Sequence, residues 1–120
     1  MLSEQELHNT AMEVVGKALE EEGFEFMTVN SQLKKDPQFV CLKDKKLHFV
    51  IVRAIQYPNN PTDYDGVLME KVRAHAEKFE ARTYYAGVGL AHGQDYALPL
   101  SKEAPVVINY QGLQEITIHG

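Results

Sequence analysis

Six basic side chains stand close together in one stretch of the sequence and are the first candidates for binding chemistry. They are Lys34, Lys35, Lys43, Lys45, Lys46 and Arg53. Only Asp36 and Asp44 are acidic in that stretch, whereas the formal net charge of the whole chain is −5. Because phosphate binding requires a basic surface, an anionic partner such as a nucleic acid is expected to bind here. In the alternative interpretation, these lysines solvate a turn and discourage pairing between strand edges.

The remaining polar residues exclude several kinds of site. Cys41 is the only cysteine, so neither an internal disulfide nor a CxxC zinc or redox motif can form. The five histidines, at positions 8, 48, 75, 92 and 119, lack the HxH and HExxH spacings typical of zinc ligands. The sequence therefore predicts no metal site and no cofactor.

Length and composition predict a single domain spanning residues 1–120. A chain of 120 residues with 44% hydrophobic residues can form one core. No apolar run approaches the roughly 18 residues that a membrane helix needs. The opening residues, MLSEQELHNT, have neither the basic patch nor the apolar segment of a secretion signal. We therefore expect a soluble, cytoplasmic protein without a membrane partner.

The elements that position the basic stretch begin with a helix. Ser3 and Glu6 form a capping-box pattern, so a helix should start at about Glu4 and stop before Gly23. A strand over residues 24–29 follows, and then a hairpin of two strands over residues 38–43 and 46–55. The continuous apolar run from Phe49 to Val52 indicates a strand covered on both faces, in the middle of a sheet.

The second half of the chain predicts a crossover back to that central strand. A helix is expected from about Tyr64 to Phe79, with Leu68, Val72, Ala76 and Phe79 on its inner stripe. A strand over residues 83–91 should then lie parallel to the central strand. A short strand over residues 106–110 and a terminal turn or helix over residues 112–118 complete the chain. The expected fold is α/β, a mixed sheet of about five strands flanked by helices.

This order of helix, strand, hairpin, helix and strand resembles the restriction-endonuclease-like fold of the PD-(D/E)XK nucleases, over approximately residues 3–90. In that family an acidic residue opens the second strand, and an acid-x-Lys motif ends the third. In register, these positions fall on Gln38, Ile51 and Arg53. The resemblance implies Mg²⁺ held between two carboxylates and the scissile phosphate, with the lysine supporting the attacking group.

The residues at those three positions predict that hydrolysis is lost. An isoleucine cannot ligate magnesium, a glutamine offers only a neutral carbonyl, and Arg53 cannot act as a base at neutral pH. We therefore expect a non-catalytic binding or interaction module. One alternative is a Mg²⁺-dependent nuclease with a migrated site, in which Asp36 and Glu13 join Gln38 and Arg53. Another is a purely structural homodimer, formed through a sheet edge or a helix face.

A second resemblance covers the whole chain. The segments LKKDPQFVCLKDKKLHFVIVRA, MEKVRAHAEKF, TYYAGVGLA and NYQGLQEI are similar to a family of short Bacteroidetes proteins. These proteins often carry the label of a component of the sodium-translocating NADH:quinone reductase. That label implies a ferredoxin-type iron–sulfur cluster, a flavin site and a membrane anchor. Such a cluster requires four thiolates and this chain has one, so the family likeness is kept and the label is not.

Overall fold

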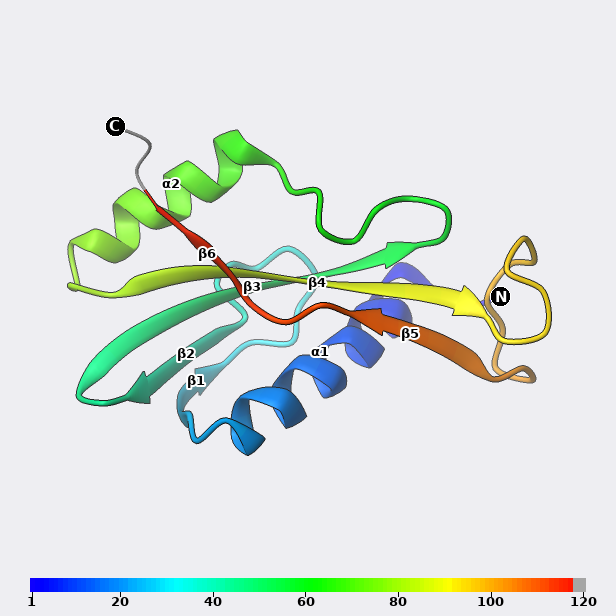
Figure 1. Cartoon of the computed structure of the whole chain (residues 1–120), viewed down its shortest axis with the longest axis horizontal. Coiled ribbons are helices and arrows are strands. Elements are labelled where there is room, and N and C mark those ends of the chain that lie inside the picture. The colour runs from blue at the N-terminus through cyan, green and yellow to red at the C-terminus, as the bar shows by residue number, and fades with distance from the viewer. Residues whose placement is uncertain (118–120) are drawn as a thin grey trace.

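A mixed sheet with a helix against each face forms the architecture of this chain (Figure 1). The computed structural model describes residues 1–117. The elements in chain order are α1 (Glu4–Glu21), β1 (Glu25–Val29), β2 (Phe39–Lys43), β3 (Lys46–Gln56), α2 (Gly66–Glu77), β4 (Arg82–His92), β5 (Val106–Tyr110) and β6 (Gln114–Ile116). The expected α/β class with a mixed sheet is confirmed.

The strands follow the order β1-β2-β3-β4-β5, and β6 also pairs with β4. The pair β3–β4 is parallel and all the other pairs are antiparallel. The predicted crossover through α2 and the central position of β3 are therefore both confirmed. In this register Arg53 lies beside Gly87 on β4.

The α1 side of the sheet holds the larger core. Ser3 caps the helix through its side chain, and Glu6 returns a hydrogen bond to the Ser3 backbone, as the capping-box pattern predicts. Gly23 has a φ of 89°, a left-handed conformation that suits glycine and ends the helix. The buried residues of α1 pack against alternate residues of β3 and β4, among them Val50 and Val88.

On the opposite face, α2 is shorter than the sequence predicts. It spans Gly66–Glu77 in place of residues 64–79, with the Asp65 side chain accepting hydrogen bonds at its start. The helix ends early because Glu80 takes a left-handed φ of 56°. Met69 occupies the buried position, and Phe79 is 53% exposed. Its predicted place on the inner stripe is therefore wrong.

The end of the chain also differs from expectation. The sequence predicts a turn or helix over residues 112–118, but Gln114–Ile116 form strand β6, so the sheet has six strands. The free edge of β4 at Thr83–Tyr85 supplies the pairing partner, and Ile116 is buried with Met69. Ile118 lies outside the described residues.

The connection between β3 and α2 packs closely on the sheet at Gly87. A Cβ atom at this position would overlap the carbonyl oxygen of Pro61 and the hydroxyl of Tyr85. The Tyr85 hydroxyl donates a hydrogen bond to the Pro61 carbonyl at 3.0 Å. Only glycine allows the connection to lie this close to β4. Within residues 1–117, none of the helices has the length and apolar character to cross a bilayer.

Candidate functional site

Three of the four residues proposed for a migrated nuclease site come together at the carboxyl end of β3. The Arg53 guanidinium donates to both oxygens of the Asp36 carboxylate, Nη1 to Oδ1 and Nη2 to Oδ2, each at 2.8 Å. The Gln38 amide donates to Asp36 Oδ1 at 2.9 Å. The side chains of Arg53 and Asp36 are only 16% and 12% exposed. The result is a bidentate ion pair that is largely shielded from solvent.

Gln38 positions this cluster by extending the pairing of β2 with β3. Its backbone N–H donates to the Val50 carbonyl, and its side-chain Oε1 accepts from the Val52 N–H at 2.7 Å. The amide side chain thus replaces the next backbone acceptor beyond the end of β2. Because the side chain spans this gap, its Nε2 group reaches Asp36.

The electrostatics of the cluster favour an ionised carboxylate. Burial alone would raise the pKa of Asp36, but hydrogen bonds from Arg53 and Gln38, with the guanidinium charge, lower it below its ordinary value. The carboxylate and the guanidinium therefore neutralise each other. Two of the donors on Nη1 and Nη2 serve Asp36, and another from Nη1 goes to the Val52 carbonyl.

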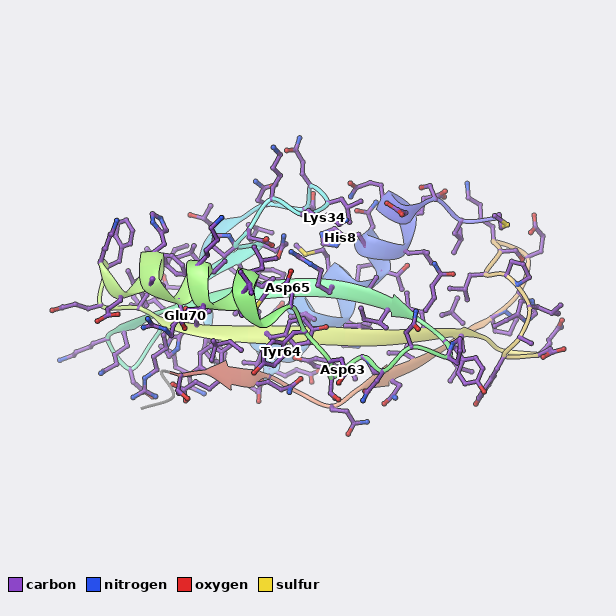
Figure 2. The ribbon with its side chains drawn as sticks, turned by 90° about the horizontal axis from the view of Figure 1, so that it is seen from above. His8, Lys34, Asp63, Tyr64, Asp65 and Glu70 are labelled. Atoms are coloured by element: carbon purple, nitrogen blue, oxygen red, sulfur yellow. The ribbon has the colours of Figure 1, made fainter. Side chains whose placement is uncertain are left out.

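His8 on α1 is a buried neighbour that the sequence places only among the scattered histidines. Both of its ring nitrogens are buried without a hydrogen-bond partner. Burial lowers the pKa of His8, the positive charge of Arg53 lowers it further, and the negative charge of Asp36 opposes both. The imidazole is therefore neutral in the folded protein. Figure 2 shows His8 beside the loop that carries Lys34, which the Gln5 side chain also ties to α1 by accepting from the Leu33 N–H.

The position of the second acid in the nuclease motif is wholly apolar. Ile51 is fully buried and packs with Met69, Tyr85 and Ile116 beneath α2. A carboxylate there would have neither solvent nor a basic partner in this cluster, so its burial would be strongly unfavourable.

The fourth proposed residue, Glu13, does not join the others. It is exposed on α1 and lines a shallow groove with Phe26, Val29 and Phe39. Across residues 1–117, no group of three or more His, Cys, Asp or Glu side chains is placed to hold a metal ion. The geometry thus brings Asp36, Gln38 and Arg53 together as an ion-pair cluster and leaves Glu13 apart.

The six basic residues do not form one patch. Lys34 lines a pocket with Arg53 and Glu4 at the carboxyl end of β3, whereas Lys45 and Lys46 line another with Phe79 at the amino end. Seven residues of β3 separate Lys46 from Arg53, which is about 23 Å at roughly 3.3 Å per residue. The expected single anion-binding face is therefore two separate groups.

The group at the amino end of β3 contains residues that the basic stretch of the sequence does not include. The β2–β3 turn and the α2–β4 turn lie at the same end of the molecule (Figure 1). Lys45, Lys46, Leu47, Phe79 and Glu80 line a groove of about 570 Å³ there. Arg82 begins β4 opposite His48, and the positive charges of Arg82 and Lys43 act on that histidine. We call this set, Lys43, Lys45, Lys46, Lys78, Phe79 and Arg82, the basic end.

Phe79 is accessible because of how it packs. Its ring lies 5.9 Å from the Phe49 ring and 5.3 Å from the His75 ring, and about half of the residue remains exposed. The sequence places Phe79 on a helical stripe, and only the end of α2 at Glu77 frees it. His8, in contrast, was detectable, since it lies between Leu7 and Ala11 on the apolar stripe of α1.

Comparison with known proteins gives a family for the whole domain. The model of a family described as a domain of unknown function (DUF8840) matches residues 5–116, so this chain belongs to that family. The search of curated proteins and the search of solved structures returned no match.

Proposed function

We propose that this chain is a non-catalytic binding module of restriction-endonuclease-like fold, which binds an anionic partner through its basic end. The observation that carries the proposal is the closed ion pair of Asp36 with Arg53. In a nuclease site these positions would face a metal ion and a phosphate, whereas here each charge is already paired with the other.

The proposed fold is supported by the arrangement of the elements. The chain has the order of helix, strand, hairpin, helix and strand that the resemblance implies, with a parallel β3–β4 crossover. Gln38 and Arg53 meet at the end of the central strand, where the motif positions of the resemblance fall.

The absence of catalysis is supported by the chemistry of the same positions. Ile51 cannot ligate a cation, and its packing under α2 leaves no room for hydration of a carboxylate. Asp36 is the one acid of the cluster, and a metal ion there would have to displace a guanidinium held at 2.8 Å. A single carboxylate is a poor site for Mg²⁺, which is usually bound by carboxylates together with substrate phosphates.

Binding is assigned to the basic end because its charges are accessible. Lys45 and Lys46 are exposed and make no ion pair among the described residues, whereas Arg53 is paired and shielded. Exposed lysines contact phosphates, and the free face of Phe79 offers a surface on which a base or another planar group can stack.

A single-stranded oligonucleotide is a suitable polyanion to test this assignment by fluorescence anisotropy at low salt. We expect measurable association that weakens as salt rises, with a slope of about −0.7 per phosphate contact. The double variant Lys45→Glu, Lys46→Glu should lose that association. The matched control, Lys34→Glu with Lys35→Glu, reverses two charges at the other end of β3 and should retain most of it. No association of the wild-type chain at low salt would overturn the binding assignment.

A separate assay tests the absence of catalysis. Purified protein is incubated with single-stranded, duplex and branched DNA in the presence of Mn²⁺, and no cleavage products are expected. Cutting by the wild-type chain that disappears in the Asp36→Ala variant would establish the nuclease alternative in place of this proposal.

A further inference from the structure

The two edges of the sheet differ in how they are protected against pairing with another strand. At one edge, the register of β1 against β2 shifts between Phe26 and Thr28, so Met27 forms an irregularity, and Glu25 adds a charge. Bulges and charges are the usual protection of an exposed edge. At the other edge, β5 pairs with β4 in an unbroken register and contains no charged residue and no proline.

The backbone of β5 has three residues whose hydrogen-bonding groups face away from β4. The Gly93 N–H donates to the Pro105 carbonyl at 2.7 Å, which fixes the alternation of bonded pairs between the two strands. Val107 and Asn109 therefore bond to β4, and Val106, Ile108 and Tyr110 direct their N–H and C=O groups outward. The edge of β5 is the end of the strand order among the described residues.

This outward set is complementary to itself. If a second copy is placed antiparallel with a two-fold axis at Ile108, each Ile108 exchanges two hydrogen bonds with Ile108 of the second copy. Val106 then pairs with Tyr110 of the second copy, and Tyr110 with its Val106. All three outward residues on each strand are satisfied, which is the condition for an isologous contact.

The side chains at this edge also favour burial. Ile108 is 45% exposed and Val107 is 38% exposed, although both are large and apolar. Tyr57 and Tyr96 are about half exposed and line one pocket with Val107, so the apolar surface continues beyond the strand. Covering such a surface with a second strand removes apolar area from water.

Charge selects a second copy as the occupant. Residues 104–114 contain no charged side chain, in a chain with a net charge of −5. Two acidic copies can therefore approach at this edge without repulsion between like charges. We propose that the chain forms a homodimer through antiparallel pairing of β5 with β5, centred on Ile108, so that the two sheets become continuous.

The oligomeric state tests this dimer directly, by sedimentation velocity over a series of protein concentrations. We expect a dimer for the wild-type chain and a monomer for Ile108→Lys, which places two positive charges opposite each other at the axis. Met27→Lys is the matched control on the other edge, and it should remain dimeric. A wild-type chain that is monomeric at every concentration overturns the proposal.

A cross-linking experiment tests the register and does not depend on a destabilising change. Diamide, the oxidant, takes up the two electrons and two protons released when two thiols form a disulfide. Ile108→Cys should cross-link several-fold faster than Val107→Cys, because residue 108 faces its own copy and residue 107 faces Asn109. The native Cys41 is buried, and burial raises the pKa of its thiol to about 11, so it should stay unreactive.

Equal cross-linking of the two variants, or faster cross-linking of Met27→Cys, would overturn the β5 register. The dimer and the proposed anion binding are separable, since the Ile108→Lys variant should still bind the oligonucleotide at its basic end. Loss of binding only in the hairpin variants leaves the dimer intact.

Discussion

At the carboxyl end of β3, Arg53 is shielded and fully committed to Asp36, whereas at the amino end Lys46 is exposed beside the ring of Phe79. Both residues belong to the same basic stretch of the sequence. The difference arises because β3 continues beyond its pairing with β2, which lets the loop before β2 deliver a carboxylate to one end only. A count of basic residues therefore predicts binding surface only where no acid folds back onto the strand.

The largest expected effect comes from removing the acid of the paired end. Asp36→Ala leaves the Arg53 guanidinium shielded and without its partner, so the free energy of unfolding should fall by about 3 kcal/mol. Urea denaturation followed by circular dichroism measures this change. The matched control is Glu77→Ala, which removes an exposed partner of Arg73 and should change stability little. An equal loss in both variants would mean that the two kinds of ion pair do not differ.

Removing the amide that joins the two strands should have the next largest effect. Gln38→Ala leaves the buried Val52 N–H without an acceptor, and it also removes one donor to Asp36. The expected loss in the free energy of unfolding is about 2 kcal/mol. A loss below about 0.5 kcal/mol by urea denaturation would show that water replaces the amide at this position.

The buried histidine should make stability depend on pH. The pKa of His8 is lowered from 6.5 in the folded chain, so below about pH 6.5 the unfolded chain binds more protons than the folded one. Stability should therefore fall as pH drops from 7 to 5. His8→Leu should flatten this dependence, although the lowered pKa of His48 leaves part of it. Urea denaturation at both pH values measures the change, and an unaltered slope would contradict the prediction.

The smallest expected effect lies at the exposed end. Lys46→Ala removes a solvated charge and should change the free energy of unfolding by no more than about 0.5 kcal/mol. The same variant should weaken oligonucleotide binding in the anisotropy assay. A large loss of stability would show that this lysine is structural, like Arg53, and the contrast between the two ends would disappear.

Local patterns predicted the elements that depend on local chemistry. The capping box at Ser3 and Glu6, the hairpin, and the parallel crossover from β3 to β4 are all present in the structure. Each follows from a side-chain hydrogen bond, a short turn or a rule of connection that residues close in sequence satisfy. The pattern failed where contacts are distant, since β6 exists only because Thr83–Tyr85 offers an open edge some thirty residues away.

The candidate site was predictable in its members and not in its state. Setting the sequence in register named Gln38 and Arg53, and the search for a displaced acid named Asp36. The bidentate pairing was not predicted, because it depends on the path of the loop over residues 30–37. The basic end was predicted only in part, since Phe79 joins it through the early end of α2.

The long strand β4 has one side against β3, and its other side is divided between β5 and β6. It is therefore the mechanical spine of the domain, since every later segment of the chain is anchored to it. Tension applied at the carboxyl terminus would detach β6 and then β5 in sequence, like two separate clasps, before the spine itself yields. A chain fastened in this way can lose its last segment and keep the remaining body assembled.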